Sequence, residues 1–259
     1  MKTKQLKVSQ SIMKALHKYL NREECGYRFA AQYIDGAESE SSDAMDLGNW
    51  FEYQATGQLP RNGKVPQPVV LKSGKLSTAY ERMSKQAENF NELIKHYGFD
   101  IVSTGHTFTK NDIATGISDV IARKDGRLCV IDIKSTGLID DKWSEFGWNL
   151  DFLEEKHNLL IQAVHYKILA EEEFGEEVDF YFSVHSTKNE NDHLFIKVNI
   201  DPDTMEQHRL GIENTSRVLQ NEINRGFKPY PTYRRCGSCF LSEVCSEALK
   251  YPEINEINY

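Results

Sequence analysis

The residues that could do chemistry stand in the stretch Gly116–Lys134, which reads GISDVIARKDGRLCVIDIK. Within it, Asp125-Gly126 separates two apolar runs and predicts a β-hairpin with a two-residue turn, because both positions of a type I′ turn need positive φ. Counting back from this turn sets Asp119 opposite Asp132 on the neighbouring strand. Cross-strand partners lie roughly 5 Å apart, so two like charges there repel each other. We therefore expect a cation between the two carboxylates.

Lys134 is expected on the same face of the hairpin as the two acids, because it follows Asp132 by two residues. The opposite face carries Cys129, Ile131 and Ile133, and we expect it to be core. A surface hairpin with one salt bridge is the plainer alternative. The apolar residues around the acids favour a half-buried site, in which carboxylates need partners. Such a face suits a divalent metal ion and a phosphate group.

Three further polar residues are candidates for the same site. Gln162 and Tyr166 are four residues apart on a predicted helix and so share one of its faces. Such a pair is weak on its own, but this one lies on the helix that follows the hairpin. Glu52 lies on an earlier predicted helix, in the mainly apolar stretch GNWFEYQATG. It could be a solvated helix residue or a metal ligand.

The cysteines are spaced like metal ligands. Cys236, Cys239 and Cys245 form a Cys-x2-Cys-x5-Cys cluster, and Cys25 lies far upstream. In a reducing compartment clustered cysteines favour a metal over disulfides. Four thiolates fit tetrahedral zinc or an iron–sulfur cluster equally well by count. The fifth, Cys129, is expected to be a small core residue, because its strand position points it away from Asp132.

Composition limits the classes of protein that this chain can belong to. Its 259 residues carry a formal net charge of −8, which counts against a protein that coats DNA but not against an enzyme with a local basic patch. There is no apolar run long enough to span a membrane and no Walker-type phosphate loop. The N-terminal stretch lacks the apolar region of a signal peptide, so we expect a cytoplasmic protein.

Hydrophobic periodicity predicts helices first, then three strands, a helix, two strands and a last long helix. This order indicates a mixed α/β core with a helical, metal-bound flank and excludes a doubly wound sheet. The polar stretch 140–150 is expected to be a loop or lid, whose Trp143 and Trp148 could stack on bases or pack on the core. The predicted helices cover 9–20, 42–54, 76–97, 152–174 and 202–225, and the predicted strands cover 100–109, both arms of the hairpin, 178–185 and 194–200.

Together these motifs resemble the PD-(D/E)XK nuclease superfamily. The resemblance is carried by GISD with Asp119, by IDIK with Asp132 and Lys134, and by QAVHY with Gln162 and Tyr166. It is greatest to the RecB-type branch, which includes the nuclease domains of bacterial recombination helicases, the CRISPR adaptation nucleases and many phage exonucleases. It implies a restriction-endonuclease-like core with a central mixed sheet flanked by helices. The expected single domain divides into a helical region over 1–98, a nuclease core over 99–225 and a cysteine cluster over 226–259.

The resemblance also extends to the cysteines. In the iron–sulfur members of this branch, one early cysteine and a C-terminal Cys-x2-Cys-x5-Cys hold a 4Fe–4S cluster that joins the two ends of the domain. This implies a 4Fe–4S cluster on Cys25, Cys236, Cys239 and Cys245, with zinc as the alternative. One position departs from the pattern, because Glu52 stands where the most similar members have a histidine, and His106 is a weaker substitute for it.

Roles for the site residues follow from the resemblance. Mg²⁺ or Mn²⁺ would be bound by Asp119, Asp132, the backbone carbonyl of Ile133 and Glu52. Lys134 would orient or help to deprotonate the attacking water and offset charge on the phosphate. The remaining two residues, which would position the scissile phosphate or Lys134 itself, are Gln162 and Tyr166.

The implied activity is that of a metal-dependent DNA exonuclease. It would hydrolyse phosphodiester bonds at the ends of linear DNA, in recombination, repair or phage replication, and could work beside a recombinase, an annealing protein or a helicase. Candidate phosphate contacts are Lys142, Arg225, Lys228, Arg234 and Arg235. The alternative is a non-catalytic module on the same fold that binds DNA ends or recruits a partner. The paired acids argue against this alternative, because a binding module has no need for carboxylates that repel DNA.

Overall fold

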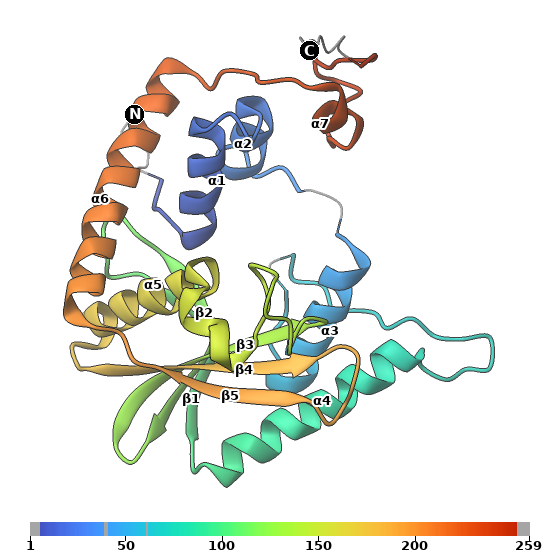
Figure 1. The fold of residues 1–259 in the computed structure, drawn as a ribbon, viewed down its shortest axis with the longest axis vertical. Coiled ribbons are helices and arrows are strands. Elements are labelled where there is room, and N and C mark those ends of the chain that lie inside the picture. The colour runs from blue at the N-terminus through green and yellow to red at the C-terminus, as the bar shows by residue number, and fades with distance from the viewer. Residues whose placement is uncertain (1–5, 39–40, 61, 253–259) are drawn as a thin grey trace. The chain divides into compact units, whose positions relative to one another are not determined.

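A computed structural model describes residues 6–38, 41–60 and 62–252 of the chain (Figure 1). The chain divides into two compact units. The terminal unit combines residues 1–40 with residues 210–259, and the central unit consists of residues 41–209. The expectation of a single nuclease domain over the whole chain stays a prediction.

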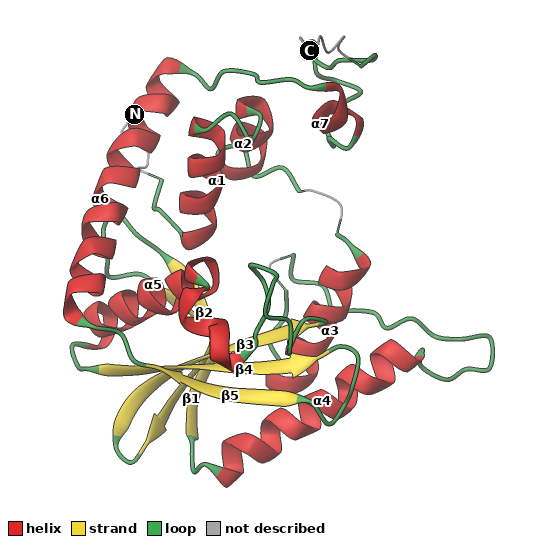
Figure 2. Cartoon of the chain, viewed as in Figure 1, coloured by secondary structure: helices red, strands yellow, loops and turns green. Residues whose placement is uncertain are grey.

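The central unit is built on one five-stranded sheet with the strand order β1-β2-β3-β4-β5. Strands β3 and β4 are parallel, and the other neighbouring pairs are antiparallel. Helices flank this mixed sheet (Figure 2), which confirms the predicted mixed α/β fold class. In chain order the elements are α3 (Asp43–Thr56), α4 (Thr78–His96), β1 (Asp100–Phe108), β2 (Gly116–Lys124), β3 (Arg127–Thr136), η1 (Leu150–Glu155), α5 (His157–Phe174), β4 (Val178–Ser186) and β5 (His193–Val198).

The turn between β2 and β3 sets the register of the site. Asp125 and Gly126 have φ values of 50° and 81°, as a type I′ turn requires. The pair next to the turn is Lys124 with Arg127, as the sequence predicts. Continued along both strands, this register brings the two acidic positions of the hairpin opposite each other.

The two faces of the sheet are covered by different helices. Helices α3 and α4 pack together and cover one face, and α5 contacts β1 to β4. The core beneath α3 and α4 is apolar, which confirms the predicted core face of the hairpin and the core position of Cys129. Its members include Phe51, Met83 and Phe90 from the helices and Cys129, Ile131 and Ile133 from β3.

The helix expected over 152–174 is interrupted, so the prediction of one continuous helix is wrong. A short 3₁₀ helix, η1, precedes α5, and Lys156 between them has φ −88° and ψ 62°, which is not helical. Asn149 begins η1 by accepting a hydrogen bond from the backbone N–H of Asp151 at 3.2 Å. A side-chain cap of this kind favours a new helix start, which hydrophobic periodicity alone does not reveal.

The two tryptophans of the loop from Gly137 to Asn149 differ in their burial. Trp148 is 3% exposed and meets the ring of Phe182 edge-on, with the centroids 5.0 Å apart. Trp143 is 84% exposed. The expectation that such tryptophans pack on the core is therefore confirmed for Trp148 and wrong for Trp143.

The terminal unit is helical, with α1 (Gln10–Leu20), α2 (Gly26–Tyr33), the later part of α6 (Pro202–Arg225) and α7 (Tyr233–Gly237). Helices α2 and α7 were not expected from the sequence. The Tyr19 hydroxyl donates to Glu222 at 3.0 Å and accepts from the backbone N–H of Lys228 at 3.2 Å. These bonds join the N-terminal and C-terminal segments of the unit around an apolar core that includes Leu16, Phe29 and Leu219. Among the described residues, no helix is long and apolar enough to cross a membrane.

Candidate active site

The acids of the hairpin contact the partners that the sequence places beside them. Asp132, on β3, is 1% exposed. One of its oxygens, Oδ1, accepts a hydrogen bond from Gln162 Nε2 of α5 at 2.8 Å, and Oδ2 lies 2.5 Å from Lys134 Nζ. Asp119 Oδ2 accepts from the backbone N–H of Ile133 at 2.7 Å. The structure therefore brings five of the predicted site residues into one connected set.

A glycine allows Tyr166 to join this set. Gly116 opens β2, and a Cβ atom added to it would lie 2.7 Å from the Tyr166 ring, closer than real Cβ contacts. The tyrosine ring therefore packs directly over the start of the strand. This role of Gly116 was not expected from the sequence, although a glycine in a predicted strand often marks a close approach of this kind.

Glu52 reaches the site from α3. An added Cβ at Gly48 would lie 3.3 Å from Ser135 Oγ, so the helix approaches the end of β3 closely. Glu52 follows Gly48 by four residues and so lies on the same helix face. It is half-buried, and its charge acts on Asp119. By contrast, His106 contacts Glu173 at 3.9 Å and the ring of Phe174, and none of its contacts among the described residues reaches Asp119.

Burial and mutual repulsion control the ionisation of the site. Burial raises the pKa of Asp119 well above its ordinary value, and Asp132 and Glu52 raise it further. Burial also raises the pKa of Asp132, against the opposing effect of Lys134. Burial alone would lower the pKa of Lys134, but the two aspartates reverse this effect and raise it. Burial and the same carboxylates raise the pKa of Tyr166 to about 12, so its hydroxyl is protonated at neutral pH. The negative charge of Asp119, Asp132 and Glu52 is thus greater than the positive charge of Lys134 can offset.

The carboxylates fit a hard divalent cation chemically. Asp132 Oδ2 is buried and accepts no well-directed hydrogen bond from the residues described, so its contact with Lys134 is an ion pair and leaves acceptor capacity unused. Oxygen ligands of this kind suit Mg²⁺ and Mn²⁺. Within the described ranges, however, no three His, Cys, Asp or Glu side chains converge as a complete metal-binding group. The donor atoms are suitable, but they do not form a finished coordination shell.

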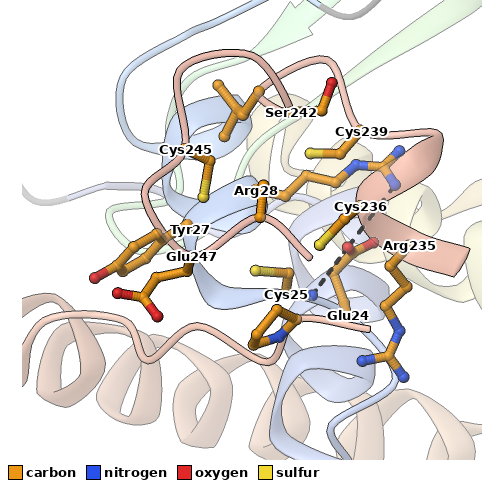
Figure 3. Close-up of a pocket in the computed structure, with 13 residues that line it drawn as sticks. Glu24, Cys25, Tyr27, Arg28, Arg235, Cys236, Cys239, Ser242, Cys245 and Glu247 are labelled. Carbon is orange, nitrogen blue, oxygen red and sulfur yellow. Dashed lines mark hydrogen bonds and ion pairs between the residues drawn. The ribbon is translucent and has the colours of Figure 1, made fainter. Parts of the chain in front are cut away.

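The cysteine cluster forms a second candidate site, inside the terminal unit. All five cysteines of the chain are free thiols. Figure 3 shows four of them lining one pocket, with their sulfur atoms directed toward a shared space. The pocket also carries charged residues of both signs. Its cysteines are Cys25, Cys236, Cys239 and Cys245, and its charged residues are Glu24, Arg28, Arg235 and Glu247.

Backbone contacts bring these cysteines together. Gly26 follows Cys25 and donates its N–H to the carbonyl of Lys228 at 3.1 Å, where an added Cβ would lie only 2.2 Å from that oxygen. Helix α7 carries Cys236, and the turns after it carry Cys239 and Cys245, with the Cys239 N–H donating to the carbonyl of Cys236 at 3.2 Å. Thiol ligands suit zinc or an iron–sulfur cluster, but the absence of a complete metal-binding group among the described residues applies here too.

Cys129 is separate from this pocket. It is fully buried on β3, where burial raises the pKa of its thiol to about 11. A thiol of this kind stays protonated and is a poor metal ligand.

Comparisons with known proteins identify the family of the chain. The family model of the PD-(D/E)XK nuclease superfamily matches residues 15–246. Among solved structures, a "Putative exonuclease" from Eubacterium rectale has a TM-score of 0.63 at 18% identity, covering 96% of this chain and 91% of its own. The structure of SSO0001 has a TM-score of 0.37 at 13% identity, covering 96% of this chain and 90% of its own. A search of curated proteins gave no match. The chain belongs to the PD-(D/E)XK nuclease superfamily.

Proposed function

We propose that the chain is a metal-dependent deoxyribonuclease that hydrolyses phosphodiester bonds from the ends of linear DNA. The observation that carries this proposal is the buried Asp132, bound by Gln162 on one oxygen and paired with Lys134 on the other. Lys134 can offset only one of the two neighbouring carboxylates, Asp132 and Asp119, so a further cation is expected to bind beside them. The exonuclease name of the similar solved structure supports action at DNA ends.

In this proposal Asp119, Asp132, Glu52 and the carbonyl of Ile133 hold Mg²⁺ or Mn²⁺. The metal ion would neutralise phosphate charge and lower the pKa of a bound water. The hydrogen bond from the Ile133 N–H fixes the orientation of Asp119, so that its other oxygen is available for binding. Since metal binding requires both aspartates to be ionised, their raised pKa values make binding stronger as the pH rises.

The other three polar residues act on the phosphate and the water. Lys134 carries its proton at neutral pH, because the acids raise its pKa, and it therefore acts first as a positive charge for the phosphate oxygens. Gln162 orients the carboxylate of Asp132. The Tyr166 hydroxyl is protonated and can donate a hydrogen bond to a phosphate oxygen or to the attacking water.

We also propose a structural metal centre on the four cysteines that line the terminal pocket. A 4Fe–4S cluster is our first choice and zinc is the alternative, because the donor set suits both. Anaerobic purification followed by visible absorbance and metal analysis separates them. A brown protein containing iron and sulfide supports the cluster, whereas a colourless protein with stoichiometric zinc supports the alternative.

The nuclease proposal is tested by incubating the protein with end-labelled single-stranded, blunt duplex and circular DNA in Mg²⁺ or Mn²⁺. We expect linear DNA to be degraded from its ends and circular DNA to survive. Cleavage of circular DNA would contradict end dependence. DNA binding without hydrolysis in either metal would favour the non-catalytic module that binds ends or recruits a recombinase, annealing protein or helicase.

A further inference from the structure

The connection between α3 and α4 contains basic residues and no acidic ones. Residues 57–77 contain four lysines or arginines and no aspartate or glutamate, although the whole chain has 31 basic and 39 acidic residues. One of the four, Arg61, lies outside the described residues. The other three, Lys64, Lys72 and Lys75, are exposed, and no ion pair is found for them with any described residue. The connection thus carries positive charge that no acidic residue within it offsets.

The last part of this stretch, Val69–Ser77, forms a small ribbon. Val70 pairs with Leu76 in an antiparallel bridge, and the N–H of Leu71 donates to the carbonyl of Lys75 at 2.8 Å. Gly74, with φ of 79°, closes the turn, so two of the lysines flank the tip. In Figure 1 the segment extends outward from the ends of α3 and α4, within the central unit. We call residues 57–77 the basic ribbon.

The basic ribbon also exposes apolar side chains. Five of them keep between 43% and 55% of their surface in water, which is unusual for so short a segment. None of its residues is aromatic. The exposed side chains are Leu59, Val65, Val69, Val70 and Leu71.

We propose that the basic ribbon is a contact surface for duplex DNA, with Lys64, Lys72 and Lys75 on phosphates and the valine and leucine side chains in a groove. This inference rests on the proposed function. Charge favours nucleic acid, because positive side chains that bind phosphates release counterions. Proteins that bind the minor groove combine basic residues with apolar ones in this way. Single-stranded DNA is the less suitable ligand, since its binding sites rely on aromatic stacking and the ribbon has no aromatic residue.

The position of the basic ribbon connects it to the candidate active site. It begins at Gly57, the C-cap residue of α3, five residues after Glu52 in that helix. Its base is held by packing between α3 and α4, including a hydrogen bond from Trp50 Nε1 to Ser84 Oγ at 3.1 Å. Duplex bound by the ribbon is therefore anchored to the same helix as the candidate metal ligand.

The test measures binding of a fluorescent blunt duplex by anisotropy over a range of salt, in Mg²⁺ and in the Asp132→Asn background so that the DNA stays intact. One variant combines Lys64→Gln, Lys72→Gln and Lys75→Gln. The control combines Lys18→Gln, Lys95→Gln and Lys250→Gln, three exposed lysines elsewhere, so both variants lose the same charge. We expect the ribbon variant to bind at least about tenfold more weakly and its slope of log Kd against log salt to fall by about 3, one per lost phosphate contact. The control should stay close to the parent.

A second variant separates groove contacts from charge. Val65→Ser with Leu71→Ser should weaken duplex binding severalfold without changing the salt slope. Equal salt slopes for the ribbon variant and the control would overturn the inference. So would a ribbon variant that loses as much affinity for single-stranded DNA as for duplex DNA. Undiminished DNA binding would assign the ribbon to a protein partner instead. If the nuclease proposal is wrong and the ribbon inference is right, the wild-type chain will bind duplex DNA through the ribbon but hydrolyse no DNA.

Discussion

The two candidate sites differ in what fixes their geometry. In the central unit, the register of β2 and β3 and the packing of α5 hold the acids, and contacts of 2.5 to 2.8 Å join them to Lys134, Gln162 and Ile133. In the terminal unit, four thiols line one pocket from the start of α2, from α7 and from the turns after it, and they are not linked to one another. Backbone hydrogen bonds of the sheet thus fix the geometry of the first site, and no bound ligand is needed for this. In our proposal the second takes its final geometry from the metal that the thiols would bind.

This difference predicts opposite failures. Substitution of the acids on the sheet should abolish hydrolysis and leave the protein folded, because the sheet does not depend on these acids for its stability. Damage to the cysteine pocket should weaken the terminal unit, because the bound metal would hold its chain ends together.

The largest effect is expected from Asp132→Asn. The amide keeps the shape and the hydrogen bond from Gln162 but loses the charge that pairs with Lys134 and binds the cation, so hydrolysis in Mg²⁺ should fall by about 10³-fold or more. Initial rates on end-labelled linear DNA measure the loss. The matched control is Asp125→Asn in the turn of the same hairpin, where the side chain is 89% exposed. A rate within tenfold of wild type for Asp132→Asn would remove Asp132 from the site.

Gln162→Ala should have a smaller effect on the same reaction. It removes the hydrogen bond to Asp132 Oδ1 and leaves that buried oxygen without its donor. We expect hydrolysis to fall by about 10- to 100-fold, with a higher Mg²⁺ concentration needed for half-maximal rate. Titration of the rate against Mg²⁺ separates this positioning role from damage to the fold. An unchanged Mg²⁺ requirement would mean that Gln162 acts on the DNA and not through the carboxylate.

The grouping of the acids and the lysine on the sheet could be predicted from the sequence for a physical reason. A two-residue Asp-Gly turn and strict alternation determine which side chains share a face, so Asp119, Asp132 and Lys134 could be grouped without coordinates. The break at Lys156, the different burial of Trp143 and Trp148, and the approach of Gly26 to Lys228 all depend on contacts between distant segments. No local pattern encodes such contacts. The charge of the basic ribbon was readable from the sequence, but its exposure was not.

Cys236→Ser tests the other side of the comparison. We expect the variant to lose the bound metal and to melt several degrees lower, because a centre that binds only the folded state stabilises it. Its hydrolysis at a temperature well below melting should fall by less than tenfold. Metal analysis and thermal melting are compared with Cys129→Ala, which removes a buried thiol outside the pocket. If Cys236→Ser eliminated hydrolysis as completely as Asp132→Asn while remaining folded, the two sites could not be independent.

The smallest effect is a gain in stability. The pKa values of Asp119 and Asp132 are raised in the folded protein, so between the ordinary aspartate value and the raised values the folded state binds more protons than the unfolded state. Linkage then makes the free energy of unfolding fall as the pH rises through that window. Asp119→Asn removes one of the two charges, so the free energy of unfolding of this variant should fall less as the pH rises. Without metal at pH 8, we expect the variant to melt a few degrees above wild type, and the difference should vanish at pH values below the window.

Mg²⁺ should reverse the order of the two melting temperatures, so that wild type melts above Asp119→Asn. The ion binds the ionised pair in the folded state and so stabilises wild type as its concentration rises, whereas Asp119→Asn has lost a ligand and should respond little. Melting curves at pH 8 with and without Mg²⁺ measure both effects in one experiment. Wild type that is already the more stable protein without metal would mean that Lys134 alone compensates the two carboxylates. In that case the sheet site would be complete without a cation, and the contrast with the cysteine pocket would become sharper still.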